Sequence, residues 1–142
     1  IQTEIVSLGT GAGTVDNVRP GGLIAIGTKL DPSLSRSDSL IGSIIGKPGT
    51  LPDNSSNAKL KTSLFDTAIG SAGETKITPL QVGELLRISI GTAPVPAKIS
   101  KVKSNDIEIE FRRPVCIFNE ASVALSRRIA DRWRLIGAGV VG

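Results

Sequence analysis

Ile107-Glu108-Ile109-Glu110-Phe111 alternates apolar and acidic side chains without a break. Because successive side chains of a β-strand point to opposite faces, this stretch predicts a strand with one buried face and one face toward solvent. Residues 86–90 alternate in the same way. Residues 104–106, Ser-Asn-Asp, separate the first of these strands from an apolar stretch at 97–103, and this arrangement predicts a β-hairpin.

Short apolar runs continue outward from this hairpin in both directions at nearly even spacing, separated by Gly, Pro, Asn, Asp and Ser. Helical periodicity is weak, and even residues 59–69, which fit a helix face or an alternating strand, are interpreted as a strand. The pattern is typical of an antiparallel all-β barrel or sandwich. The further strands we expect lie at residues 5–8, 23–28, 40–46, 59–69, 115–118, 121–129 and 133–141.

The first 39 residues differ from the rest. The apolar run at 23–26 lies between a Pro-Gly-Gly turn and a Gly-Thr-Lys-Leu-Asp-Pro exit, which predicts a buried strand with sharp ends. We expect a flexible loop at 9–17 and a linker at 31–39 that contains a domain boundary. An incomplete β piece would then precede about 100 residues, enough for one small antiparallel barrel.

Proline and turn-forming residues refine these boundaries. Proline lacks a backbone N–H, so Pro20 and Pro114 are expected at strand starts, where the ladder loses no donor. Residues 52–58 are polar and rich in turn formers, and residues 70–79 are expected to form a loop.

The composition excludes several classes of function. The chain has 142 residues with no His, no Met and one Cys, and its formal net charge is +4. The missing Met indicates a fragment of a longer protein. Without His, the commonest general base and metal ligand is absent. Cys116 is interpreted as a small core residue. The use of a single cysteine favours a reducing, cytoplasmic compartment. No apolar run approaches the roughly 20 residues that span a bilayer.

Positive charge is concentrated near the end of the sequence. Arginine suits planar, bidentate recognition of carboxylate or phosphate. This cluster is therefore either a solvated basic face or a surface for RNA or an acidic partner. Trp133, between two of these arginines, is a stacking platform for a base or, in the favoured interpretation, a core or half-buried residue. The candidate RNA-binding residues are Arg112, Arg113, Arg127, Arg128, Arg132 and Arg134.

Three segments resemble nucleotide-binding motifs, and each lacks an essential part. Residues 9–14 have no third glycine for a dinucleotide fingerprint and no amphipathic helix after them. Residues 42–47 are one residue short of a phosphate-binding loop, and Pro48 stands where a hydroxyl would bind magnesium. Residues 28–31, Thr-Lys-Leu-Asp, have the form of a guanine motif, but Pro32 follows at once and no phosphate loop precedes them.

No carboxylate pair has a nearby candidate nucleophile. Glu108 and Glu110 share one strand face and alternate with core residues, so we interpret them as charges facing solvent. The residues by themselves therefore favour a binding or scaffold module with no catalytic residue, cofactor site or metal site.

Five ordered segments carry a resemblance to a known family. They read PGGLIAIGTKLDPSLSRSD at 20–38, GSIIGKPGTLP at 42–52, GELLRISIGT at 83–92, EIEFRRPVCIF at 108–118 and VALSRRIADRWRLIGAG at 123–139. The series resembles the gamma subunit of archaeal and eukaryotic translation initiation factor 2, closer to the archaeal type, through nearly the whole chain. Residues 53–76 depart from the family pattern.

The resemblance implies an all-β fold: a small antiparallel Greek-key barrel of the translation-factor domain III type, preceded by an incomplete second β-barrel. Residues 1–35 would be the C-terminal part of domain II, and residues 36–142 would be domain III. The GTP-binding domain would lie outside this segment, so the segment is not an enzyme, although the full-length protein is a GTPase that uses GTP and Mg.

The resemblance also implies partners. The family forms a heterotrimer with alpha and beta subunits, binds initiator methionyl-tRNA and acts on the small ribosomal subunit. The alpha subunit docks on loops of the second barrel, which makes Thr10, Asp16 and Arg19 candidate partner-binding residues. Two alternatives remain: a purely structural protein-interaction barrel without RNA contact, or the equivalent region of a related elongation factor.

Overall fold

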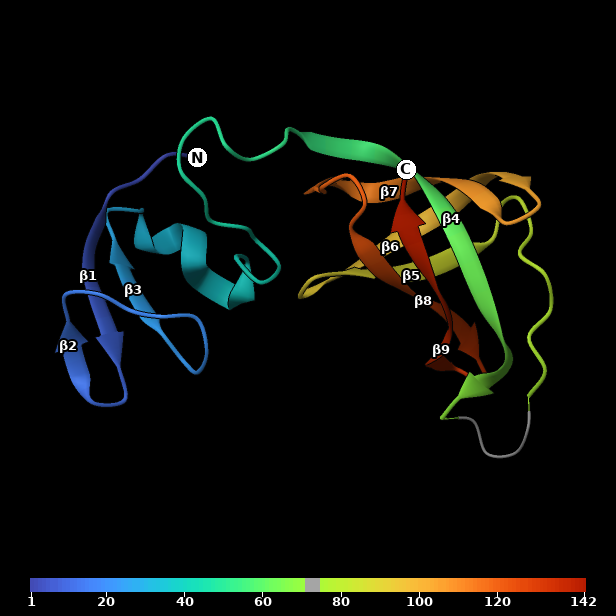
Figure 1. Cartoon of the computed structure of the whole chain (residues 1–142), viewed down its shortest axis with the longest axis horizontal. Coiled ribbons are helices and arrows are strands. Elements are labelled where there is room, and N and C mark those ends of the chain that lie inside the picture. The colour runs from blue at the N-terminus through green and yellow to red at the C-terminus, as the bar shows by residue number, and fades with distance from the viewer. Residues whose placement is uncertain (71–74) are drawn as a thin grey trace. The chain divides into compact units, whose positions relative to one another are not determined.

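The computed structural model describes residues 1–70 and 75–142, and these fall into two compact units, Ile1–Leu40 and Ile41–Gly142. Strands dominate both units (Figure 1), and the all-β class predicted from the sequence is confirmed. Each unit is described by itself below. The proposed assignment of residues 1–35 and 36–142 to two barrel domains stays a prediction.

The second unit is a closed antiparallel barrel in the order β4-β7-β6-β5-β8-β9. Strands β5, β6 and β7 follow one another through hairpins, and β4 lies beside β7 rather than beside β5. This connection defines a Greek key, as the family resemblance implied. The strands are β4 (Asn54–Ile69), β5 (Leu85–Ile90), β6 (Ala93–Lys103), β7 (Asp106–Cys116), β8 (Ser122–Ile129) and β9 (Arg132–Val141).

The core of this barrel consists of the inward positions of alternating strands. Ile107 and Ile109 are each 1% exposed, while Glu108 and Glu110 between and beyond them face outward, as predicted. Truncating such a buried aliphatic side chain to alanine costs about 2–5 kcal/mol. The largest fully buried side chains are Leu60, Leu86, Ile88, Val95, Ile99, Ile107, Ile109, Leu125 and Ile136.

Two tight hairpins fix the register on opposite sides of the barrel. Ser104 (φ 55°) begins the predicted turn between β6 and β7. Between β8 and β9, Ala130 (φ 48°) and Asp131 (φ 61°) form a two-residue loop closed by the pair Ile129↔Arg132. Positive φ at both central residues is the requirement of a type I′ turn, whose twist matches that of the flanking strands.

Prolines lie inside two strands, so the expected position of Pro114 at a strand start is wrong. Pro114 belongs to β7, in a stretch where neither β4 nor β6 is paired with it residue by residue. Pro94 and Pro96 similarly precede Ala97, where the pairing of β6 to β7 begins. In both places the missing N–H costs no ladder hydrogen bond, which is why a proline is tolerated there.

The first unit is a three-stranded sheet in the order β2-β1-β3, followed by the 3₁₀ segment η1. Asp31 caps η1, because its Oδ1 accepts a hydrogen bond of 2.8 Å from the N–H of Ser33. The expected linker at 31–39 is therefore mostly helical, and the expected loop at 9–17 is mostly a tight hairpin. The elements are β1 (Ile5–Thr10), β2 (Gly13–Val15), β3 (Ala25–Thr28) and η1 (Pro32–Asp38).

Several boundary predictions are wrong for one physical reason, which is that an apolar run alone does not fix burial. Leu23 is 92% exposed and precedes β3, although residues 23–26 were expected to be buried. No residue of Ile1–Leu40, all of which are described, is fully buried. Residues 40–46 form no strand, and residues 52–58 are largely the start of β4 rather than a turn.

Other expectations are refined. Only Val115 and Cys116 of the run 115–118 belong to a strand, β7. Cys116 is half-buried and not in the central core, with its Sγ 3.6 Å from the carbonyl oxygen of Pro52. The predicted loop at 70–79 lies partly outside the described residues, since 71–74 are not described.

Candidate functional site

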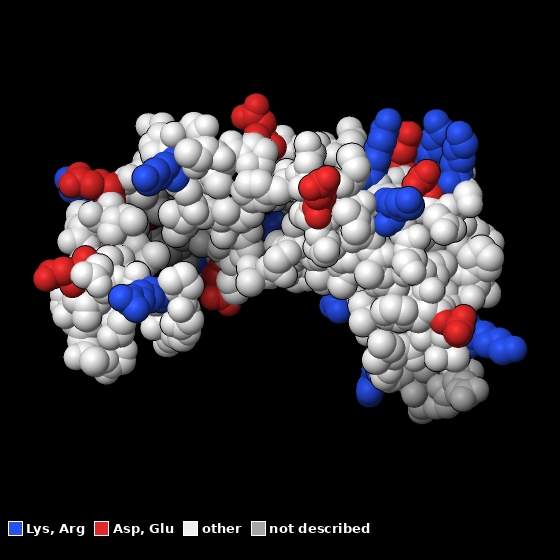
Figure 2. Space-filling model, viewed as in Figure 1, with Lys and Arg blue, Asp and Glu red and all other residues white. Residues whose placement is uncertain are grey.

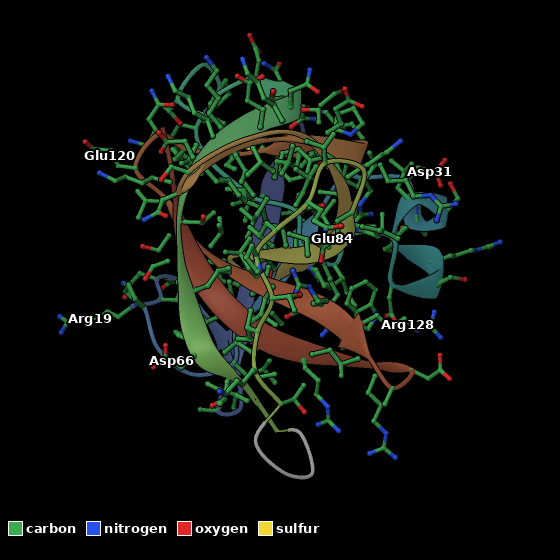
Figure 3. The ribbon with its side chains drawn as sticks, turned by 90° about the vertical axis from the view of Figure 1, so that its right-hand side faces the viewer. Arg19, Asp31, Asp66, Glu84, Glu120 and Arg128 are labelled. Atoms are coloured by element: carbon green, nitrogen blue, oxygen red, sulfur yellow. The ribbon has the colours of Figure 1, made fainter. Side chains whose placement is uncertain are left out.

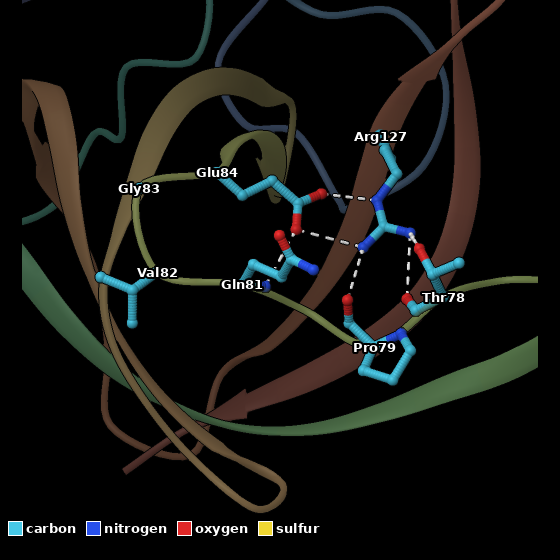
Figure 4. Close-up of a pocket in the computed structure, with 7 residues that line it drawn as sticks. All are labelled: Thr78, Pro79, Gln81, Val82, Gly83, Glu84 and Arg127. Carbon is cyan, nitrogen blue, oxygen red and sulfur yellow. Dashed lines mark hydrogen bonds and ion pairs between the residues drawn. The ribbon is translucent and has the colours of Figure 1, made fainter.

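Arg127, on β8, is held by the segment that precedes β5 (Figure 4). Its Nε donates to Glu84 Oε1 at 2.5 Å, and its Nη2 donates to Glu84 Oε2 at 3.1 Å. Its Nη1 donates to the carbonyl oxygen and the hydroxyl of Thr78 at 3.0 and 2.9 Å. This is the fork geometry in which a guanidinium recognises a carboxylate with two parallel bonds.

The Arg127–Glu84 pair is shielded from solvent. The two side chains are only 15% and 19% exposed, and they line a hollow of about 480 Å³ together with Thr78, Pro79 and Gln81. A second contact strengthens the arrangement, because the N–H of Gln81 donates to Glu84 Oε2 at 3.2 Å. The guanidinium thus ties β8 to the segment before β5, and its donors are committed within the chain.

Trp133 and Arg128 face each other across the β8–β9 hairpin. The guanidinium carbon of Arg87 lies 5.2 Å from the centroid of the Trp133 ring, a cation–π contact. The stack buries Arg87 Nε, which has no hydrogen-bond partner. Trp133 is half-buried, so the favoured interpretation of a half-buried residue is confirmed.

Arg128 contacts Asp131 of the same hairpin, with its Nη2 3.2 Å from Oδ1. These side chains are 63% and 93% exposed, so solvent screens the pair and it holds the arginine only weakly. Figure 3 shows the Arg128 side chain directed away from the barrel. Arg128 is therefore available to a partner, whereas Arg127 is occupied.

The six candidate arginines do not form one cluster. Arg127, Arg128, Arg132 and Arg134 lie on the β8–β9 hairpin, whereas Arg112 and Arg113 lie on β7, which pairs with β4 and β6. Arg112, Arg113 and Arg132 are exposed, and Arg134 is half-buried. An alanine methyl group at Gly70 would lie 3.1 Å from Arg134 Nη1, which places this arginine against the end of β4.

The candidate partner-binding residues of the first unit lie on and after the β1–β2 hairpin. Thr10 is exposed at the end of β1, opposite Gly13, and its hydroxyl accepts a hydrogen bond of 3.3 Å from the N–H of Ala12. Asp16 and Arg19 are exposed on the following segment. Figure 3 shows Arg19 pointing away from the ribbon.

Sequence reasoning missed Glu84 and Thr78 as partners of Arg127, and Arg87 as the partner of Trp133. Arg127 and Glu84 are 43 positions apart, and no local pattern signals such a contact. Glu108, interpreted from the sequence as a charge facing solvent, lies near Lys59 and Lys101. Within residues 1–70 and 75–142, no group of three or more His, Cys, Asp or Glu is close enough to hold a metal ion. In the same ranges no helix is long and apolar enough to cross a membrane.

The closed Greek-key barrel defines the class of fold, a small antiparallel β-barrel domain. Its residues 56–141 match the family described as "Initiation factor eIF2 gamma, C terminal". The chain belongs to this family.

Curated relatives agree with the family match over almost the whole chain. The chain is similar to "Translation initiation factor 2 subunit gamma" of Aeropyrum pernix, with 43% identity over 141 residues, covering 99% of the chain and 34% of the relative. The corresponding protein of Methanocaldococcus jannaschii is 42% identical over 141 residues, with the same coverage of 99% and 34%. That of Archaeoglobus fulgidus is 38% identical over 139 residues, covering 98% of the chain and 33% of the relative. The chain therefore spans about a third of the length of these relatives.

Proposed function

We propose that this chain is the C-terminal β-barrel region of a translational GTPase, the gamma subunit of translation initiation factor 2. The observation that carries the proposal is the family match over residues 56–141, which coincides with the closed barrel. In complex with GTP, the whole protein delivers initiator methionyl-tRNA to the small ribosomal subunit. This segment acts as a rigid frame and binding surface in the cytoplasm.

The proposal includes the partners and cofactors of the whole protein. GTP and Mg bind to a GTP-binding domain outside this segment, which is itself not an enzyme. The alpha and beta subunits complete a heterotrimer, with Thr10, Asp16 and Arg19 at the alpha-subunit contact. The exposure of all three side chains supports this contact, because a docking surface must be accessible.

The exposed arginines supply the RNA contact in this proposal. Arg128 and Arg132 project from a rigid type I′ hairpin, and Arg112 and Arg113 are exposed on β7. Arg134, half-buried beside Gly70, contributes positive charge to the hairpin end. Because such contacts release counterions, binding weakens as salt concentration rises.

The test uses the intact heterotrimer with Arg128→Gln and Arg132→Gln together. We expect weaker binding of initiator tRNA or of the small subunit at low salt, and a smaller salt dependence. A variant with Arg36→Gln and Lys47→Gln removes the same charge at exposed positions that are not part of the hairpin and serves as control. Equal affinities for the hairpin variant, the control and the unaltered factor would refute the RNA role of the hairpin.

A second candidate, a structural barrel without RNA contact, is favoured by the contacts of Arg127. Every donor group of this guanidinium is used by Glu84, Thr78 or Pro79. In that case, arginines hold the barrel together or bind protein carboxylates. The salt titration of RNA binding separates the two candidates, because a purely structural barrel shows no specific loss with the hairpin variant.

A further inference from the structure

A second basic surface lies on the outer face of strands β4, β7 and β6, away from the β8–β9 hairpin. Leu60, Ile99 and Ile107 on these strands point into the core, so the residues next to them point outward. A register shift between Ile99 and Lys101 turns Lys101 and Lys103 to the same outer face, because Val102 between them pairs with the buried Ile107. The outward positions carry five exposed lysines, which are Lys59, Lys61, Lys98, Lys101 and Lys103. We call this surface the lysine face.

A row of carboxylates on β7 runs between these lysines. The strand register places Glu108 opposite Lys59 on one side and Lys101 on the other. The same register places Asp106 between Lys61 and Lys103. Two lines of lysines therefore flank one line of acids, and because neighbouring strands are about 4.8 Å apart, the lysine-bearing strands lie about 10 Å apart.

The carboxylates do not neutralise the lysines. Glu108 Oε1 lies 4.0 Å from Lys59 Nζ and 3.7 Å from Lys101 Nζ, and both lysine side chains are more than 60% exposed. Exposed ion pairs at such distances contribute little. Within the described residues, Lys61, Lys98 and Lys103 make no ion pair at all.

The excess of positive charge on this face is large relative to the whole chain. Arg112 continues the outward row of β7, so six cations share the face with three carboxylates of that strand, Asp106, Glu108 and Glu110. A fourth carboxylate, Asp53, lines the same hollow as Lys59 and Glu108. The resulting excess of two is half of the chain's net charge of +4. Figure 2 shows Lys and Arg gathered with Asp and Glu over the end of the barrel where β4 and β7 lie.

The lysine face also lacks the apolar centre of a protein interface. None of the exposed large hydrophobic side chains lies within residues 57–61, 98–103 or 106–112. Val140, opposite Lys61 on β9, is a single exposed apolar side chain at the rim. Protein partners bind through buried aromatic or aliphatic anchors, whereas phosphates need accessible positive charge.

We propose that the lysine face binds the sugar-phosphate backbone of RNA. Lysine acts there as a flexible point charge, which contacts phosphate without the fixed geometry that arginine imposes. The central carboxylates repel phosphate, so contacts fall on the two flanking lines of lysines and the binding is independent of base sequence. The inference rests on the proposed function and deepens it, because Arg112 on β7 belongs to both, whereas the five lysines on β4 and β6 are not among the arginines proposed to contact RNA.

The test uses the 142-residue chain with polyuridylate as the probe. Lys61→Gln, Lys98→Gln and Lys103→Gln together remove three charges without leaving a carboxylate that had an ion-pair partner. We expect affinity to fall about tenfold or more, and the slope of log affinity against log salt to decrease by about 2, since each lost phosphate contact contributes about 0.7 for single strands. Arg36→Gln, Lys47→Gln and Lys76→Gln together form the charge-matched control, because these three exposed residues likewise make no ion pair within the described residues.

A variant that removes a negative charge from the lysine face completes the test. Glu110→Gln removes a repelling charge that makes no ion pair within the described residues, and we expect it to tighten polyuridylate binding. Absence of binding by the unaltered chain, or equal losses in the lysine-face and control variants, would overturn the inference. Unchanged or weaker binding by Glu110→Gln would overturn it as well.

Failure of the lysine-face inference is distinguishable from failure of the proposed function. If only the hairpin variant of the intact factor loses affinity for initiator tRNA or the small subunit, the proposed function stands and the lysine-face inference falls. If only the lysine-face variant loses polyuridylate binding, the inference stands and the hairpin role falls. Thermal unfolding of each variant checks that the barrel remains folded.

Discussion

Arg127 on β8 and Glu84 before β5 are joined by two parallel hydrogen bonds across 43 positions of sequence. The carbonyl oxygen and the hydroxyl of Thr78 accept two further hydrogen bonds from the guanidinium. The side chain thereby supports the segment before β5, whose backbone also bonds to Ile99 of β6 through Gly83 and Glu84. Its hydrogen bonds separate Arg127 from its neighbour Arg128, with which the charge pattern of the sequence had grouped it.

Glu84→Ala is expected to lower the free energy of barrel unfolding by about 2–3 kcal/mol, because it leaves a mostly buried guanidinium without its carboxylate. Arg127→Ala should cost a similar amount, and the double variant should cost much less than the sum. Chemical denaturation of all four proteins gives the coupling energy. Arg127→Lys should not restore stability, since lysine cannot form the two parallel bonds; full restoration would contradict the fork geometry. Arg112→Ala, on an exposed site, is the control and should change stability by no more than about 0.5 kcal/mol.

Arg87→Ala is expected to change the emission of Trp133, the chain's single tryptophan. Removing the guanidinium exposes one face of the ring to water, so the emission should shift to longer wavelength. Stability should fall by about 1 kcal/mol as the cation–π contact is lost. The chain has no tyrosine, so the spectrum reports this ring directly. Arg113→Ala should leave the spectrum unchanged, and an equal shift in both variants would argue against a specific stack.

Gly137→Ala is expected to destabilise the barrel by about 1–3 kcal/mol or more, because the added methyl group would overlap the backbone oxygen of Ser63 on β4. Gly142→Ala, whose methyl group would meet nothing within 4 Å, should be nearly neutral. Thermal unfolding of the two variants measures the difference. Equal stability would mean that β4 and β9 can separate at no cost, contrary to their pairing.

Asp31 is expected to titrate below its ordinary pKa of 3.8, because hydrogen bonds from the backbone N–H and side chain of Ser33 favour its charged form. A lowered pKa in the folded state stabilises the cap above about pH 4, and that contribution disappears as pH falls through the lowered pKa. Asp31→Asn keeps a capping oxygen but should abolish this pH dependence of η1. NMR titration of the Asp31 carboxyl carbon and of the Ser33 amide tests both statements; a midpoint at or above 3.8 would be inconsistent with the cap.

The alternating segments predicted the barrel well, because period-two alternation reports a strand that is buried on one face only. β5 and β7 follow directly from residues 86–90 and 107–111. The apolar run around Leu23 was wrongly predicted to be buried for a related reason. An apolar run is buried only where another layer packs on it, and nothing within Ile1–Leu40 does so.

The candidate sites were less predictable than the strands. The positions of Arg128 and Arg132 at the ends of neighbouring strands follow from the expected strands at 121–129 and 133–141, but the hydrogen bonds of Arg127 depend on Glu84, which is distant in sequence. The lysine face was also not visible as a cluster. Its lysines on β6 lie beside β7 through the predicted hairpin, but those on β4 become neighbours of β7 only through the Greek-key connection.

Closure of the barrel places Leu60 opposite Val141, with the N–H of Gly142 bonded to the carbonyl oxygen of Lys59 at 2.9 Å. The first and last strands of the unit therefore meet at the seam. During biosynthesis the cylinder cannot close until its final strand has been made, and until then β4 and β8 each have an unpaired edge. Because such non-local pairing slows folding, the barrel is most vulnerable to aggregation during synthesis just before β9 emerges.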